Sequence, residues 1–140
     1  VSQKASPNQY TVLCVDDNPA NLKLITRIIT KGRPEIEVLP AHTAQLGIDM
    51  ALAHRPDLIL LDINMPQMDG YQVLERLRQL PETAKTPIVA VTANAMKEAV
   101  QKGLAAGFDA YVTKPLEIAP FMETIDTWLH QSRAQNKVDS

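Results

Sequence analysis

Five short apolar runs, each followed by an amphipathic stretch, constrain the fold of this chain more than any other feature. Unbroken apolar runs indicate buried strands, whereas apolar residues spaced three or four positions apart indicate helices with one buried face. We expect strands at 11–15, 35–41, 57–61, 88–91 and 110–112. We expect helices at 18–30, 43–52, 69–80, 94–104 and 117–129, with Thr43 and Asn94 as N-caps. Strand and helix therefore alternate along the whole chain.

This alternation predicts an α/β fold in which helices cover both faces of a parallel sheet. Pro40 lies in the second run and has no N–H to donate to a neighbour, so that strand should lie at a sheet edge. An edge position suits the doubly wound strand order 2-1-3-4-5 of flavodoxin-like folds. The last helix should turn Ile118, Phe121, Ile125 and Trp128 inward, with Trp128 half-buried. The predicted fold class is thus a (βα)5 doubly wound, five-stranded parallel sheet.

Length and charge narrow the classes of protein. The 140 residues suffice for one domain, which we place at 10–130, between polar linkers at 1–9 and 131–140. The net charge of −2 and the absence of a dense basic cluster argue against direct nucleic-acid binding. No apolar run approaches the roughly 18 residues of a membrane span, and the start shows no signal-peptide pattern. With a single cysteine, these features suit a cytoplasmic protein without membrane contact.

Polar side chains close four of the five expected strands, at the edge of the sheet where sites of such folds form. The residues that follow strands one, three, four and five are Asp16, Asp17, Asp62, Thr92, Thr113 and Lys114. An aspartate at a strand end is, by itself, most often a turn or cap residue. Compatible groups at four strand ends converge on one rim, which favours a functional site instead.

The three carboxylates indicate a divalent cation, because clustered carboxylates repel one another when all are ionised. Oxygen ligands with room for water suit Mg²⁺. Thr92 as a hydrogen-bond donor and Lys114 as a point charge would leave a space for an anion beside the metal. Asp62 follows the most apolar strand and is the candidate nucleophile that would attack phosphorus and form an acyl phosphate. The metal and Lys114 would stabilise charge on the phosphoryl group in transit.

Neighbouring residues refine this expected site. Asn64 lies just past the central aspartate, where its backbone carbonyl can turn toward the metal. Ala93 is small and leaves access to the phosphoryl space. Gly70 is expected to shape a tight loop into the next helix. The bond between Lys114 and Pro115 is an X-Pro bond beside the site, so a cis peptide is expected there.

Together, these residues resemble the receiver domain of two-component response regulators. The matching segments are Val-Asp-Asp at 15–17, Leu-Leu-Asp-Ile-Asn-Met-Pro-Gln-Met-Asp-Gly at 60–70, Val-Thr-Ala at 91–93 and Tyr-Val-Thr-Lys-Pro at 111–115. The resemblance covers about 10–129, and no core motif position is missing.

The resemblance implies that Asp62 accepts a phosphoryl group from a phosphohistidine of a histidine kinase or a histidine phosphotransfer domain. It implies that Mg²⁺ is held by Asp17, Asp62 and the Asn64 backbone, with Asp16 helping largely through water. Thr92 and Lys114 would bind the phosphoryl oxygens, with Ala93 beside them. Asn64 and Asn94 match the variable positions that tune self-dephosphorylation in the family.

The resemblance also implies a switch rather than an enzyme with a separate substrate. In the family, the threonine moves toward the phosphate and an aromatic residue swings inward behind it, and Thr92 and Tyr111 are at the matching places. Phosphorylation would thereby alter the face made by the fourth helix, fifth strand and fifth helix. Phosphorylation-dependent dimerisation is a further implication.

Within the family, the segments 17–25, 92–96 and 106–111 look most like receivers attached to hybrid sensor kinases. The alternative is a stand-alone, single-domain response regulator. A purely structural pseudo-receiver is less suited, because such domains commonly lose site residues and none is lost here.

Two classes outside the family also fit parts of the pattern. A haloacid dehalogenase-like phosphatase also uses Mg²⁺ and a nucleophilic aspartate, but it usually needs a second aspartate two residues on, where this chain has Asn64. A flavin-binding electron carrier of the same topology needs a phosphate loop after the first strand. Asp16 and Asp17 occupy that loop and would repel phosphate in the absence of a metal.

Overall fold

A computed structural model describes residues 9–139, with side chains described up to residue 132. Its centre is a five-stranded parallel sheet with the order β2-β1-β3-β4-β5, as predicted. The strands are β1 (Tyr10–Val15), β2 (Ile36–Ala41), β3 (Leu58–Leu61), β4 (Ile88–Thr92) and β5 (Ala110–Thr113). The helices are α1 (Pro19–Gly32), α2 (Ala44–His54), α3 (Gly70–Gln79), α4 (Lys97–Ala106) and α5 (Ile118–Asp139).

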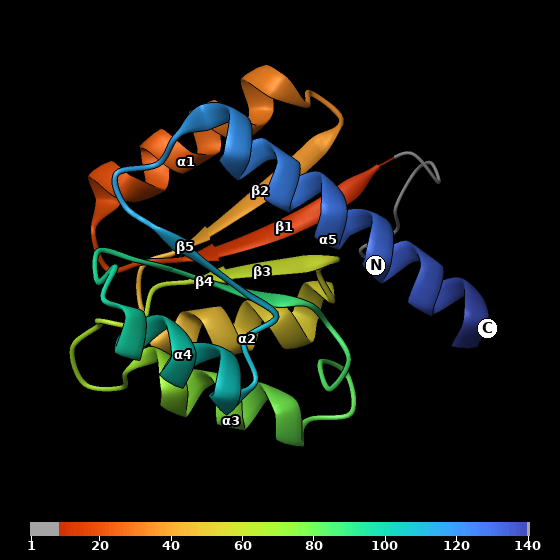
Figure 1. Ribbon diagram of the computed structural model, residues 1–140. Helices are drawn as coiled ribbons and strands as arrows, with labels where there is room; N and C mark the ends of the chain where they lie inside the picture. Colours follow the sequence, from red (N-terminus) through yellow and green to blue (C-terminus); the bar gives the residue numbers. More distant parts are fainter. Residues whose placement is uncertain (1–8, 140) are drawn as a thin grey trace.

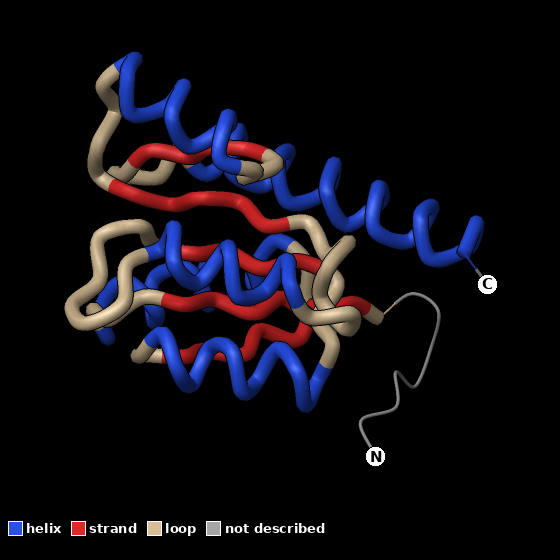
Figure 2. The backbone as a smooth tube through the Cα atoms, turned by 90° about the horizontal axis from the view of Figure 1, so that it is seen from below, coloured by secondary structure: helices blue, strands red, loops and turns tan. Residues whose placement is uncertain are grey.

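The helices cover both faces of the sheet. Figure 1 shows α1 and α5 on one face and α2, α3 and α4 on the other. Figure 2 shows the strands side by side between these helices, and in both views the end of α5 extends beyond the sheet. The sheet therefore has no face open to solvent, which explains why its central strands are apolar without a break.

Alternate residues of each central strand enter different cores, because side chains of a strand point to opposite faces in turn. Leu13, Leu61 and Ala90 join the core under α2 and α3. Cys14 and Leu60 join the core under α1 and α5. Each buried leucine or isoleucine contributes roughly 1.5–3 kcal/mol of transfer free energy, so both cores stabilise the sheet.

The second strand lies at the edge, as Pro40 predicts. In the register of the sheet, Pro40 lies beside Cys14 of β1, and β2 has no other neighbour. Because β2 has a neighbour on one side only, the missing N–H of Pro40 costs no hydrogen bond to a second strand, so proline is tolerated at this edge.

Two expectations for helices are wrong. Asn94 does not cap α4: its side chain accepts a hydrogen bond from the Met96 N–H, and the helix begins at Lys97 with Met96 as the N-cap residue. Ile118 is 62% exposed rather than buried, although Phe121 and Ile125 are buried and Trp128 is half-buried, as expected.

The chain ends differ from the expected linkers in one respect. Helix α5 continues past residue 129 to Asp139, through most of the stretch expected to be a linker. The expected linker at 1–9 lies outside the described residues except for residue 9. The assignment of both ends as linkers stays a prediction.

A half-buried set of polar contacts ties α3 to β4 and β5. The Arg78 guanidinium donates to three carbonyls of the turn at 83–86 and to Asp109 Oδ2 at 2.9 Å. The same Asp109 oxygen accepts the Ile88 N–H at 2.8 Å. Arg78 and Asp109 therefore fix the start of β4 against the start of β5. These contacts lie at the end of the sheet opposite the carboxyl ends of the strands.

Candidate functional site

The backbone brings the four predicted strand ends together. The N–H of Asp16 donates to Ala41 at 3.0 Å, and the N–H of Asp62 donates to Val15 at 3.0 Å. The N–H of Lys114 donates to the Thr92 carbonyl at 2.9 Å. Because these bonds continue the parallel ladders past the last strand residues, the side chains that follow β1, β3 and β5 emerge at one rim.

Three carboxylates meet at this rim. Asp16, Asp17 and Asp62 each offer an oxygen atom, and these atoms lie within 4.8 Å of one another. Asp16 and Asp62 are 2% and 7% exposed, whereas Asp17 is exposed. Charges this close and this buried need a compensating cation, because they repel strongly where water is scarce.

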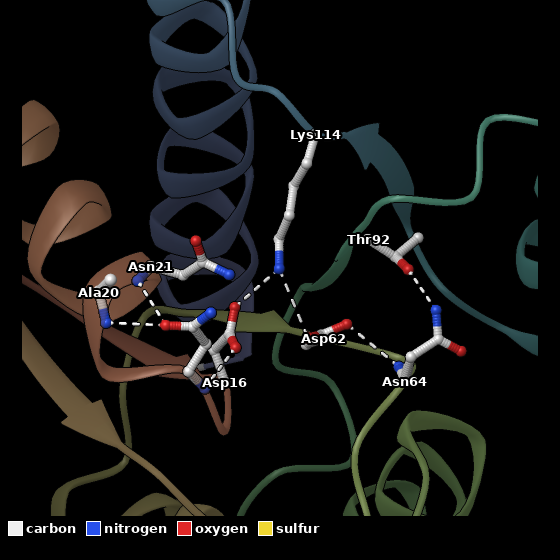
Figure 3. Close-up of polar contacts among 8 residues, drawn as sticks. Asp16, Ala20, Asn21, Asp62, Asn64, Thr92 and Lys114 are labelled. Atoms are coloured by element: carbon white, nitrogen blue, oxygen red, sulfur yellow. Dashed lines mark hydrogen bonds and ion pairs between the residues drawn. The ribbon is translucent and has the colours of Figure 1, made fainter.

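Lys114 supplies one such cation within the chain. Its ammonium lies 2.8 Å from Asp16 Oδ2 and 3.4 Å from Asp62 Oδ2 (Figure 3). Burial lowers the pKa of Lys114, but the hydrogen bond to Asp16 and the charge of Asp62 outweigh burial, so the pKa is raised above its usual value. Lys114 is therefore held as a cation between two of the three carboxylates. The peptide bond from Lys114 to Pro115 is cis.

The carboxylate of Asp62 is in an unusual environment. Burial raises its pKa, while the Asn64 N–H, which donates to Asp62 Oδ1 at 3.1 Å, and the charge of Lys114 act in the opposite direction. The net result is a raised pKa, because burial dominates and Asp16 adds repulsion.

The Asn64 side chain makes a contact that sequence reasoning missed. Its amide nitrogen donates to Thr92 Oγ1 at 3.0 Å, which joins the ends of β3 and β4 (Figure 3). The Thr92 hydroxyl accepts this bond and keeps its own proton for another acceptor. Since Thr92 is 1% exposed, Asn64 limits the directions in which that proton can point.

Ala93 and the hydroxyl of Tyr111 both lie at the segment that follows β4. Ala93 is exposed, next to the buried Thr92, so the strand end is accessible at that position. The Tyr111 hydroxyl donates to the Asn94 carbonyl at 2.7 Å. Tyr111 thus contacts the loop that begins at Thr92.

The donor set fits Mg²⁺. All three carboxylates are hard oxygen ligands, and they come together from two strand ends in the described part of the chain. The exposure of Asp17 leaves one side open for the water molecules that Mg²⁺ retains in proteins. Asp16, Asp17 and Asp62 are therefore the residues that would hold the ion.

Replacing Asp17 by Asn tests this assignment. We expect the metal-free variant to melt at a higher temperature than the wild type, because one of three repelling charges is removed. We expect the increase in melting temperature caused by Mg²⁺ to shrink several-fold, because that increase depends on affinity for the folded state. Thermal melting across a Mg²⁺ titration measures both effects.

The matched control is Asp49→Asn, which removes the same charge from an exposed position on α2. It should leave the response to Mg²⁺ unchanged. An unaltered response in the Asp17 variant would remove Asp17 from the ligand set.

Comparison with known proteins shows the class to which this fold and site belong. The sequence model of the response regulator receiver domain matches residues 12–126, most of the chain. The chain belongs to this family, and it is a receiver domain of two-component phosphorelay signalling.

Curated relatives are of two kinds. The chain is 43% identical over 107 residues to the signal transduction histidine-protein kinase BarA of Escherichia coli, a match that covers 76% of this chain and 11% of the kinase. It thus spans about a tenth of that relative's length. It is 36% identical over 119 residues to the polar-differentiation response regulator DivK of Brucella anthropi, covering 85% of this chain and 95% of DivK.

Solved structures agree with the fold. A CheY-like response regulator receiver domain protein from Methanospirillum hungatei has a TM-score of 0.80 at 30% identity, covering 91% of this chain and 98% of that one. The receiver domain of the sensor histidine kinase PA1611 from Pseudomonas aeruginosa has a TM-score of 0.78 at 28% identity, covering 87% and 98%. That structure has a magnesium ion coordinated in its active-site cleft.

These relatives establish a phosphoacceptor switch domain whose family binds Mg²⁺ at an acidic cluster and works with histidine kinases or phosphotransfer partners. Among the described residues, none of the helices has the length and apolar character needed to cross a bilayer.

Proposed function

We propose that Asp62 is the residue that accepts the phosphoryl group. The observation that carries this proposal is the position of its carboxylate, which lies among the three clustered carboxylates and beside the Lys114 ammonium, 3.4 Å away. Asp16 makes the closer ion pair with Lys114, and Asp17 is exposed to solvent. Asp62 is thus placed to face metal, ammonium and incoming phosphorus together.

In the proposed reaction, a carboxylate oxygen of Asp62 forms a bond to phosphorus, and the bond from phosphorus to the imidazole nitrogen of a phosphohistidine breaks. The electron pair of that bond leaves with the imidazole, which takes a proton from solvent. The product is an acyl phosphate on Asp62. The chain acts on itself and on a partner's phosphohistidine, so we propose no turnover of a separate substrate.

The surrounding residues have separate tasks. A bound Mg²⁺ would neutralise charge that develops on the phosphoryl oxygens. Lys114 would provide a point charge, Thr92 would donate its hydroxyl proton, and Ala93 would leave room for the group. Asp16, Asp17 and Asp62 would hold the metal, with the Asn64 backbone as a further ligand.

We also propose that Thr92 and Tyr111 transmit the event to the face made by α4, β5 and α5. Thr92 is the last residue of β4, Asn94 lies two residues further along the chain, and the Tyr111 hydroxyl bonds to the Asn94 carbonyl. A shift of Thr92 toward a phosphoryl group would therefore move the partner of Tyr111. Such a two-state element, biased by a local charge, is how phosphorylation acts at a distance.

The wider setting is part of the proposal. We favour a hybrid sensor kinase as the parent protein, supported by the identity with BarA, while the likeness to DivK supports the stand-alone alternative. The proposed partner is a histidine kinase or a histidine phosphotransfer domain in the cytoplasm, without direct contact to nucleic acid or membrane. Dimerisation on phosphorylation remains a further prediction.

Intact-protein mass spectrometry after incubation with acetyl phosphate tests the function directly. We expect a single phosphoryl adduct in the presence of Mg²⁺ and none with EDTA, because the acidic cluster repels an incoming phosphate without the metal. Absence of an adduct with acetyl phosphate and with a phosphohistidine donor protein would contradict the proposal.

A further inference from the structure

Helix α4 contacts the sheet through a glycine. The structure describes every residue of α4, and among them Gly103 alone is buried. A methyl group placed on Gly103 would lie 2.8 Å from Cδ2 of Tyr111 and 3.0 Å from its Cε2. Real side-chain carbon atoms do not approach this closely, so the Tyr111 ring occupies the space that a side chain at 103 would fill.

The Tyr111 ring is held at one further point, and Tyr71 lies near the same position of α4. The Tyr111 hydroxyl donates to the Asn94 carbonyl at 2.7 Å, on the loop before α4. The Tyr71 hydroxyl from α3 lies 3.7 Å from the same methyl position on Gly103. Gly103, Tyr71 and the Asn94 carbonyl together form what we call the Tyr111 seat.

Tyr71 is itself fixed within this seat. Its ring meets Phe108 edge to face, with centroids 5.7 Å apart and planes at 72°. The Lys102 ammonium lies 4.9 Å from the centroid of the Tyr71 ring, within reach of a cation–π contact. Tyr71 is therefore packed against an aromatic ring, and on the side toward α4 the absence of a side chain at Gly103 leaves space for the Tyr111 ring.

We propose that Gly103 is a positioning residue for Tyr111: its missing side chain lets the ring reach the Asn94 carbonyl and so couples the phosphoryl site to the α4-β5-α5 face. This inference rests on the proposed function of Tyr111 as the switch residue. Glycine inside a helix is less favourable than alanine, so its place against the Tyr111 ring matches a steric requirement rather than helix propensity.

The coupling follows from the connections within the chain. Thr92 and Asn94 lie two residues apart at the end of β4, so a movement of the Thr92 hydroxyl carries the Asn94 carbonyl with it. The hydrogen bond passes this displacement to Tyr111 only while the ring is seated. With a side chain at 103, either the ring or α4 has to shift. We expect the ring to shift and the bond to Asn94 to weaken.

NMR of the whole chain with Mg²⁺ and beryllofluoride, a phosphoryl mimic, tests the coupling. In the wild type, the amides of Thr92 and Ala93 and the ring of Tyr111 should all shift on binding. In Gly103→Ala, the two amides should shift with a beryllofluoride affinity within about threefold of wild type, while the Tyr111 shift falls by more than half. Ala105→Ser, which adds one heavy atom at an exposed position of α4, should behave as wild type.

A stability cycle tests the packing without any ligand. Gly103→Ala in a Tyr111→Ala background should raise the melting temperature by roughly 2–5 °C, since alanine is the better helix residue and the ring is gone. In the wild-type background, the same change should leave the melting temperature unchanged or lower it. An equal increase in melting temperature in both backgrounds would contradict the proposed packing of Tyr111 against Gly103.

The outcomes separate the two proposals. If the wild type shows no amide shift with beryllofluoride, the proposed phosphoryl site fails, and the role of Gly103 fails with it. If the wild type responds and Tyr111 of Gly103→Ala responds equally, the site stands and only the role of Gly103 is overturned.

Discussion

Asp62→Asn is expected to abolish the phosphoryl adduct formed with acetyl phosphate and Mg²⁺. An amide nitrogen or oxygen in place of the carboxylate is a poor nucleophile, and neither Asp16, which is paired with Lys114, nor the exposed Asp17 occupies the same position. The variant should keep its fold, because asparagine has nearly the same shape. Its melting temperature should be no lower than that of the wild type, since burial already raises the pKa of Asp62 and disfavours its charged form.

Intact-mass measurement, combined with thermal melting, distinguishes loss of chemistry from loss of structure. The matched control is Asp69→Asn, which changes the same residue type seven positions along the same loop. Asp69 caps α3 by accepting the Gln72 N–H, and asparagine caps equally well, so this control should be phosphorylated as the wild type is. A full adduct on the Asp62 variant would assign the acceptor to another residue.

Gly70→Ala is expected to cause the largest loss of stability among substitutions at the rim. A methyl group on Gly70 would lie 2.6 Å from the Ile63 Cα and 2.9 Å from the Asp62 carbonyl oxygen. Both are backbone atoms and cannot rotate away, so either α3 or the loop after Asp62 has to move. We expect a loss of roughly 2–3 kcal/mol in the free energy of unfolding, measured by urea denaturation.

The loop that has to move also positions the site, so Mg²⁺ affinity should fall in the same variant. Gly32→Ala is the matched control, because a methyl there would meet only the end of the flexible Met122 side chain, 3.2 Å away. That control should change stability by less than 1 kcal/mol. Equal effects of the two substitutions would show that the first turn of α3 has more room than its contacts indicate.

Most of the fold could be predicted from the sequence, because the central strands are buried on both faces and therefore apolar throughout. The edge position of β2 followed from one residue, Pro40, and the strand order from that edge. The start of α4 could not be predicted in the same way. Asn94 has the right side chain for an N-cap, but it bonds to the Met96 N–H within a turn that precedes the helix. Cap propensity does not distinguish these two uses.

The acidic cluster was predictable because strand ends in a parallel sheet share one rim. Contacts that depend on side-chain direction were not. The hydrogen bond from Asn64 to Thr92 joins residues 28 positions apart. Predicting it would require knowing that the ends of β3 and β4 lie side by side. Gly70 was expected to ease a turn, whereas Gly107 is the one described glycine with a positive φ. Gly70 is required instead because two backbone segments touch there, which no local pattern reveals. The assigned roles of the site residues stay predictions.

The distance along the chain between the members of the site has a consequence for biosynthesis. Asp16 and Lys114, which form an ion pair, are 98 positions apart, and Lys114 follows the last strand to be made. A chain still emerging from the ribosome has its carboxylates but not the lysine, nor the strand that carries Tyr111. With the roles proposed for Lys114 and Tyr111, a copy that ends before β5 is expected to be inactive in signalling.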